Sequence, residues 1–330
     1  RRQRQMCIRD SFYERGATID PDNEPLILQY GILLQQTGNA SFASRLLRAF
    51  LSRNPSSSEA EYHLGLLAHM QGESALAEKC YNRSINIDPL NTRAIVNRGL
   101  ALMASGQTER GLKDQEYSIL ISPALNEALL NRGMMLLASG DFEGSSRDLQ
   151  RAVHIDPSLA EPYTLLGLSL GHLRKGLDPA PYHRRAILLD PTLAEAYINL
   201  ADTLKNQKNS LLVTRYLEQG LLIKPFSPCA LSHLLHRKHQ HFDWPQHDQI
   251  MNDIRKSVLT LKIPQDPFAL LAIEDDPQLH HQTARLFSHR LVKVASPFEQ
   301  PSTRPRRKIR IGYFSADFHD HATMHLLSLI

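Results

Sequence analysis

The stretch from Pro55 to Pro89, PSSSEAEYHLGLLAHMQGESALAEKCYNRSINIDP, decides the fold because its landmarks return at a fixed interval along most of the chain. Proline recurs every 34 residues without a slip, at Pro21, Pro55, Pro89, Pro123, Pro157, Pro191 and Pro225. A small residue keeps the same interval, at Gly31, Gly65, Gly99, Gly133, Gly167 and Ala201. Because proline lacks a backbone N–H, it predicts the end of one helix and the start of the next unit. The small residue lies in mid-helix and predicts a close approach of two helices.

Each interval predicts a pair of helices joined by a short turn. Glycine marks four of these turns, since it commonly lies just past a helix end, at Gly38, Gly72, Gly106 and Gly140. The predicted pairs are 24–57, 58–91, 92–125, 126–159, 160–193 and 194–227, and half a unit (12–23) precedes them. A period of 34 residues is that of the tetratricopeptide repeat. The chain therefore resembles arrays of this repeat, and residues 12–227 are expected to form an all-α superhelical solenoid.

A stack of such pairs has a concave face that suits an extended polypeptide. The first helix of each pair is expected to line it, with the residue two places before the small residue pointing inward. That place holds Gln29, His63, Asn97, Asn131, Leu165 and Asn199. An amide both donates and accepts, so Asn97, Asn131 and Asn199 are predicted to bind the main chain of an acceptor protein or extended peptide. The alternatives are an ordinary solvated helix face, and an array that is only a spacer.

The distribution of charge and apolar residues excludes several classes of partner. The net charge is +4, but residues 1–11 and 304–330 each carry +3, so residues 12–303 hold 29 basic and 31 acidic residues. A net charge of −2 gives the array no electrostatic footprint for nucleic acid. No run approaches eighteen apolar residues, so no membrane partner is expected. Three cysteines without a pairing pattern favour a cytoplasmic location.

Residues 228–303 are expected to form a helical connector, which several prolines divide into short helices. Histidines cluster there, at His233, His236, His239, His241 and His247. No cysteine or carboxylate completes a ligand set beside them, so we expect a solvated or packing cluster and no metal site. The lone tryptophan, Trp244, is predicted to be a core anchor of this connector.

The composition changes again at residues 304–330. The stretch KIRIGYF at 308–314 predicts a strand, and an apolar helix is expected from Thr323 onward. This is the opening of a βα unit. Polar residues follow the strand, where open parallel sheets bind ligands, at Ser315, Asp317, His319 and His321. Capping of the helix by Asp320 or Thr323 is the alternative role for this loop.

The stretch IGYFSADFHDHATMHL at 311–326, together with FDW at 242–244 and PFALL at 267–271, resembles the protein O-linked N-acetylglucosamine transferases. This family, glycosyltransferase family 41, joins tetratricopeptide repeats to a GT-B catalytic region of two Rossmann-like lobes. The resemblance, which is to bacterial-type members, implies transfer of a sugar to serine or threonine hydroxyls of proteins, with UDP-N-acetylglucosamine as the expected donor. His321 aligns with an active-site histidine of the family, so the resemblance implies that it is the catalytic base.

The same resemblance implies that residues 304–330 hold only the start of the first lobe. The residues that would bind the uridine and the diphosphate belong to the second lobe, so the fragment itself is expected to bind no cofactor or metal and to be inactive. Two functions remain open: the N-terminal part of a protein O-glycosyltransferase, or a non-catalytic interaction scaffold. Residues 1–11 read like a translated sequencing adapter or a disordered basic terminus, and Ile330 falls within the predicted helix.

Overall fold

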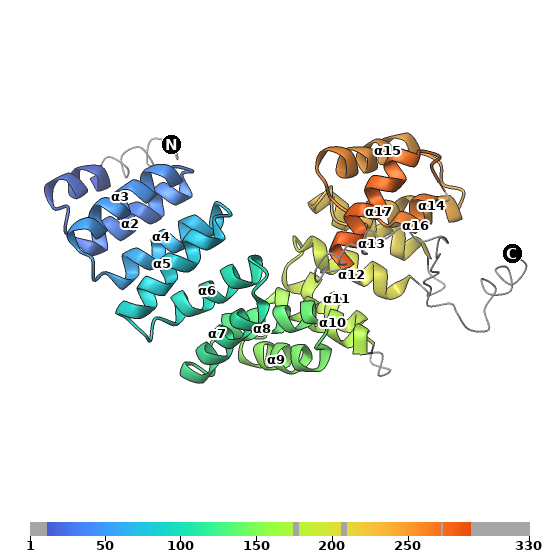
Figure 1. Ribbon diagram of the computed structural model, residues 1–330. Coiled ribbons are helices and arrows are strands. Elements are labelled where there is room, and N and C mark those ends of the chain that lie inside the picture. The colour runs from blue at the N-terminus through green and yellow to red at the C-terminus, as the bar shows by residue number, and fades with distance from the viewer. Residues whose placement is uncertain (1–11, 174–177, 206–209, 272, 292–330) are drawn as a thin grey trace, which may run out of the picture. The chain divides into compact units, whose positions relative to one another are not determined.

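The computed structural model describes residues 12–173, 178–205, 210–271 and 273–291. These residues form helices joined by turns, with no strand among them, in a solenoid like that of tetratricopeptide repeats (Figure 1). The chain divides into two compact units, Arg1–Phe287 and Ser288–Ile330, and nearly all the described residues belong to the first. The predicted strand at 308–314 and the helix after it lie outside the described residues.

The predicted helix pairs are confirmed in order along the first unit. A helix at 12–19 precedes them. The first helices of the pairs are α2 (Glu24–Gln36), α4 (Ser58–Met70), α6 (Thr92–Ala104), α8 (Asn126–Ser139), α10 (Ala160–Leu173) and α12 (Ala194–Leu204). The second helices are α3 (Ala40–Arg53), α5 (Ser74–Ile87), α7 (Thr108–Ile121), α9 (Phe142–Ile155), α11 (Ala180–Leu189) and α13 (Ser210–Ile223). Each second helix ends two residues before the repeating proline, as the proline requires.

Local hydrogen bonding explains where the helices begin and turn. Three first helices start at a polar cap whose side-chain oxygen accepts a backbone N–H three residues on, at Asn23, Ser57 and Asn91. The four turn glycines have φ angles of 81°, 78°, 82° and 87°, in the order Gly38, Gly72, Gly106 and Gly140. A positive φ is strained for residues with a Cβ, so these glycines stop the first helix and allow a tight return.

The helix-pair contact explains the repeating small residue. A Cβ added to Gly65 would lie 2.7 Å from the ring of Tyr81, closer than atoms pack. In the next pair the two backbones themselves meet, because a Cβ on Gly111 would lie 2.6 Å from the carbonyl oxygen of Gly99. The predicted close approach of the two helices is therefore confirmed.

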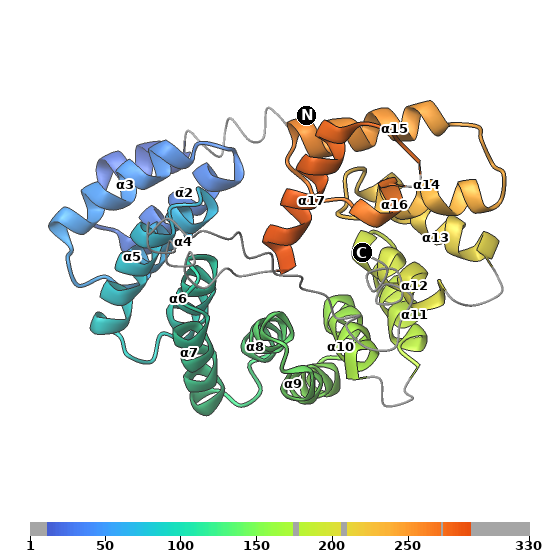
Figure 2. The ribbon, with the colours of Figure 1, turned by 45° about the vertical axis from the view of Figure 1, so that its right-hand side comes forward.

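The first helices form the inner face of the array. Consecutive pairs pack against each other in chain order (Figure 2). In addition, each first helix from α2 to α10 contacts the next first helix, whereas no described second helix contacts the next second helix to a comparable extent. The first helices are thus closer together than the second helices, which lie on the outer face.

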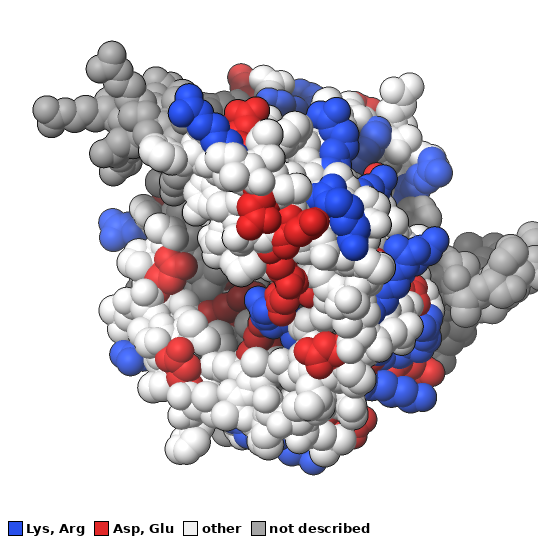
Figure 3. Space-filling view, turned by 90° about the vertical axis from the view of Figure 1, so that its left-hand side faces the viewer, with Lys and Arg blue, Asp and Glu red and all other residues white. Residues whose placement is uncertain are grey.

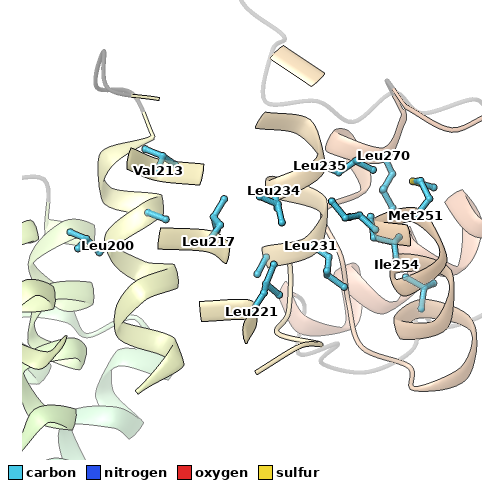
Figure 4. Close-up of a cluster of buried hydrophobic side chains, with 14 of the residues drawn as sticks. Leu200, Val213, Leu217, Leu221, Leu231, Leu234, Leu235, Met251, Ile254 and Leu270 are labelled. Atoms are coloured by element: carbon cyan, nitrogen blue, oxygen red, sulfur yellow. The ribbon is translucent and has the colours of Figure 1, made fainter. Parts of the chain in front are cut away.

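The connector continues the first unit as α14 (Ala230–Gln240), α15 (His247–Arg255), the π-helix η1 (Lys256–Thr260), α16 (Pro267–Leu271) and α17 (Pro277–Leu291). One apolar cluster joins it to the last helix pair (Figure 4). The pair contributes Leu217 and Leu221, which lie opposite Leu234 and Leu231 of α14, and Leu200 belongs to the same cluster. Because the core is continuous, the connector covers the apolar end of the array.

The expectation that Trp244 anchors the connector core is wrong. Its side chain is 54% exposed, and its ring lies 4.6 Å from the ring of His239. The turn after α14 explains the difference, since Phe242 and Gln246 both have positive φ. Leucines of α14, among them Leu234 and Leu235, fill the core in its place.

A candidate polypeptide-binding face

The three predicted asparagines lie on three first helices, α6, α8 and α12. Asn97 and Asn131 are 9% and 8% exposed, and Asn199 is half-buried. At the same place in the other repeats, Gln29 is exposed, whereas His63 and Leu165 are half-buried. The 34-residue interval therefore places these residues at the same position of the first helices, but their side chains are exposed to different extents.

Asn97 is already hydrogen-bonded within the protein. Its Nδ2 donates to the carbonyl oxygen of Arg93 at 3.0 Å and to the hydroxyl of Tyr62 at 3.4 Å. This amide therefore helps to join α4 to α6. Its replacement affects stability as well as any ligand contact.

Asn131 differs because its Nδ2 is buried and has no hydrogen-bond partner among the described residues. A buried amide donor without a partner costs about 1–3 kcal/mol. Leu165 occupies the same place in the next repeat, so the fold does not need a polar residue here. The unpartnered amide is the observation on this face that points most directly to a ligand.

An aromatic and charged cluster connects α4, α6 and α8. The guanidinium of Arg93 lies 5.1 Å from the centre of the Tyr62 ring and pairs with Glu59 at 2.6 Å. Burial raises the pKa of Tyr62, which the charge of Arg93 lowers and the carboxylates of Glu127 and Glu59 raise further. Since Glu127 comes from α8, side chains of three successive first helices act on one hydroxyl. Burial also lowers the pKa of His63, whose ring lies 5.1 Å from that of Tyr62.

Acidic residues form an edge along this face that the net charge of the array conceals. The second residue of the first helix is a glutamate in four repeats, at Glu59, Glu127, Glu161 and Glu195. Glu59 pairs with Arg93, and Glu195 pairs with Lys224 at 2.7 Å. Neither Glu127 nor Glu161 makes an ion pair within the described part of the chain. Figure 3 shows acidic side chains, with basic ones among them, around and inside a hollow on the side of the N-terminal helix pairs.

In five first helices, the residue directly after the small residue is apolar and half-buried. Together these five residues form an apolar stripe. Its members are Ile32, Leu66, Leu100, Met134 and Leu168. The face thus combines acidic, amide and apolar rows, each at the 34-residue interval. The 34-residue interval that predicts the amide row also marks the acidic and apolar rows in the sequence.

His321, the predicted catalytic residue, lies outside the described residues. In the connector, Nε2 of His239 lies 2.8 Å from Nδ1 of His247, and His233 lies 3.2 Å from the carboxylate of Asp266. Burial lowers the pKa of His239, and the charges of His247 and His236 lower it further. Among the described residues, no group of three or more His, Cys, Asp and Glu side chains is placed to hold a metal ion. None of the described helices is long and apolar enough to cross a membrane.

Comparison with known families supports the repeat assignment for part of the chain. Residues 29–92, which run from α2 into the start of α6, match the tetratricopeptide repeat family. No curated protein sequence matches the chain at a significant level. The fold is therefore that of a tetratricopeptide-like solenoid.

Two solved structures show the same fold. The Cut9–Hcn1 hetero-tetramer of APC/C matches with a TM-score of 0.62 at 14% identity, over 84% of this chain and 52% of that one. A structure from the functional characterisation of Pseudomonas aeruginosa PilF matches with a TM-score of 0.56 at 13% identity, over 72% of this chain and 99% of that one. YrrB, described as a repeat protein with an unusual peptide-binding site, gives a TM-score of 0.43 at 16% identity, over 54% of this chain and 92% of that one.

Proposed function

We propose that the chain binds an extended polypeptide along its inner face, and that the amide row holds the main chain of that segment. The observation that carries this proposal is the buried, unpartnered Nδ2 of Asn131. A main-chain carbonyl of a bound segment supplies the acceptor that this donor lacks in the free protein. The apolar stripe adds contact area on the same face.

The acidic edge selects among such segments. Glu127 and Glu161 have no cationic partner among the described residues, so a lysine or arginine of the bound segment completes these pairs. Pairs on an exposed edge change the association rate and salt dependence more than the affinity. We therefore expect unfolded basic segments to bind faster than acidic segments, and the difference to shrink as salt is added.

The decisive variant is Asn131→Leu, which copies Leu165 of the next repeat. The loss of one neutral hydrogen bond weakens binding by about 2- to 12-fold. Unfolding should occur at the same temperature or a higher one, because a buried unpartnered donor is removed. The probe is a reduced and alkylated, permanently unfolded basic protein, with its affinity measured by biolayer interferometry and melting measured by circular dichroism.

The matched control is Gln150→Leu, which replaces an exposed amide on the second helix α9. It should bind the unfolded probe as tightly as the wild type. Unchanged binding by Asn131→Leu, or an equal loss in Gln150→Leu, contradicts the assignment of the inner face.

A second candidate function rests on the stretch at 311–326. We propose that the array presents acceptor proteins to a protein O-glycosyltransferase that begins at about residue 304, with a UDP-sugar, UDP-N-acetylglucosamine first, as the donor. In such an enzyme His321 lies at the end of the first strand, where an imidazole can accept or share a proton. The support is the sequence resemblance alone, so the non-catalytic scaffold is the simpler reading of the described residues.

The test of this second function uses the gene continued beyond Ile330. With saturating UDP-N-acetylglucosamine and a protein acceptor, His321→Ala should lower the transfer rate by a factor of about 100 to 10,000. His319→Ala is the control and should lower it far less. Equal, small effects of the two substitutions would remove His321 from the chemistry, and absence of transfer by the continued protein would leave the scaffold.

A further inference from the structure

A buried carboxylate occupies a core position in the second helix pair. The fourth residue of the first helix is apolar and fully buried in the neighbouring repeats, at Ile27, Ile95 and Leu129. In α4 this residue is Glu61, which is only 6% exposed. The repeat pattern therefore breaks here in favour of a charged group, and such breaks of local rules are expected at functional sites.

The protein supplies Glu61 with too few partners. Its Oε1 accepts from Arg83 at 3.4 Å, and its Oε2 has no hydrogen-bond partner in the part of the chain that the structure describes. The Arg83 side chain is 55% exposed, so this pair is weak. In the fourth pair, by contrast, both oxygens of Asp148 accept from Arg132, at 2.6 and 2.7 Å. A buried charge is retained where it is fully paired, and the second oxygen of Glu61 is not.

A cavity of about 670 Å³ lies beside Glu61, lined by α3, α4 and α5. Its apolar lining includes Leu51, Leu64 and Leu76, and its cations are Arg48, Lys79 and Arg83. These three cations all act on the thiol of Cys80, which also lines the cavity, so they surround the same space as Glu61. The cavity lies between the second helices α3 and α5, away from the inner face.

The Cys80 thiol is not a nucleophile in this cavity. Burial raises its pKa to about 11, and the charge of Glu61 acts in the same direction. The thiol therefore stays protonated at neutral pH, when a thiolate would be needed for reaction. The chemistry of the cavity is that of binding.

We propose that this cavity binds a free α-amino acid with an aliphatic side chain. The ammonium group donates to the unpartnered Oε2 of Glu61, and the carboxylate faces the cations Arg48, Lys79 and Arg83. The aliphatic side chain packs on the apolar lining. Charge-assisted hydrogen bonds of this kind are stronger than neutral ones, and guanidinium groups suit the planar carboxylate.

Neither charge alone satisfies the site. A simple anion would meet the cations but would leave the buried carboxylate of Glu61 unpaired and repelled. A simple cation would reach Glu61 but would be surrounded by Arg48, Lys79 and Arg83. A ligand that carries both groups on one carbon atom, as an α-amino acid does, matches the two sets of charges.

Isothermal titration calorimetry with three probes of one shape tests this match. L-leucine carries both charges, leucinamide lacks the carboxylate, and 4-methylpentanoate lacks the ammonium group. L-leucine should bind, and each analogue should bind about 10- to 100-fold more weakly, as expected for the loss of a hydrogen bond to a charged group. No binding of L-leucine, or equal binding of all three probes, overturns the proposal.

Two variants assign the site to Glu61. Glu61→Ile restores the residue found at Ile27 and Ile95, so the protein should fold and melt at the same or a higher temperature. It should lose L-leucine binding by at least about 10-fold, and the near-isosteric Glu61→Gln should also weaken it. Binding equal to that of the wild type in Glu61→Ile overturns the proposal. Asn131→Leu, on the inner face, should leave L-leucine binding unchanged, so this site and the polypeptide-binding face are tested separately.

Discussion

At one set of matching places the third and fourth helix pairs hold their two helices together with charges, whereas the pairs on either side have uncharged residues there. Arg98 and Arg132 each bind both oxygens of a carboxylate one helix away, Asp114 and Asp148, at 2.6–2.7 Å. The same two places hold Leu64 and Cys80 in the second pair, and Leu166 and Tyr182 in the fifth.

The repeat therefore fixes the positions of the two residues that join the helices of a pair, but it does not fix whether those residues are charged. The Asp148 side chain is 5% exposed and that of Arg132 is 22% exposed, so the pair is largely out of water. The bidentate geometry allows this, because both oxygens of the carboxylate are satisfied by one planar group. The hydrogen bonds to Asp148 also raise the pKa of Arg132 against the effect of burial.

The largest expected effect follows from breaking one central ion pair. Asp148→Ala leaves the Arg132 guanidinium without its partner and should destabilise the protein by about 3–5 kcal/mol. Urea unfolding followed by circular dichroism measures this loss. The double variant Arg132→Leu with Asp148→Cys, which copies Leu64 and Cys80, should recover most of it. A double variant as unstable as the single variant would mean that the central pairs need charge for packing.

The fifth pair should respond to pH through a buried histidine. Burial lowers the pKa of His183 to about 4, against the opposing charges of Asp202 and Asp178. The unfolded chain therefore binds a proton near pH 6.5 that the folded protein does not bind, and stability is lost as the pH falls from about 6.5 to 4. The loss should reach about 3 kcal/mol.

His183→Leu is the matched control for this pH effect, since Leu149 and Leu217 hold the same place in adjacent repeats. Its unfolding free energy should fall less than that of the wild type between pH 7 and pH 4.5. Identical pH profiles for the two proteins would show that His183 is not the group responsible.

A smaller effect on stability is expected where the two helices of a pair come closest, because the third pair has a glycine there and the second pair has an alanine. Gly111→Ala places a Cβ 2.6 Å from the carbonyl oxygen of Gly99 and should cost about 1–3 kcal/mol. The reverse change at the same place of the second pair, Ala77→Gly, should cost only about 1 kcal/mol through helix propensity. Thermal melting of both variants measures the contrast, and a Gly111→Ala protein as stable as the wild type would disprove the backbone contact.

The smallest effect is expected at an exposed ion pair. Glu195 and Lys224 lie 2.7 Å apart with side chains 49% and 54% exposed. Lys224→Ala should change the unfolding free energy by less than about 1 kcal/mol. A loss as large as that of Asp148→Ala would mean that burial does not distinguish the two kinds of pair.

The helix pairs could be predicted from the sequence because proline and glycine act through the local backbone. The 34-residue interval placed each turn, and Gly72 and its equivalents have the positive φ that the turn needs. The exposure of Trp244 could not be predicted, because it depends on two positive φ angles in a turn that has no repeat. The roles of Asn97, Asn131 and Asn199 stay predictions.

Side-chain partners were visible in the sequence only as spacing. Arg98 and Arg132 lie 34 residues apart, as do Asp114 and Asp148, but spacing does not say which side chains touch. Glu61 was equally visible as a carboxylate at an apolar place. Whether its second oxygen has a hydrogen-bond partner depends on how α3, α4 and α5 pack together, so this could be seen only in the structure.

The four turn glycines give the array a local reversal of handedness. At Gly38, Gly72, Gly106 and Gly140 the backbone adopts the conformation that is natural to a D-residue, and no atom lies within 4 Å of the position that an added L-Cβ would take. The obstacle to a side chain there is therefore backbone chirality and not crowding. Each turn is a site where a mirror-image amino acid fits the chain better than any of the encoded chiral residues.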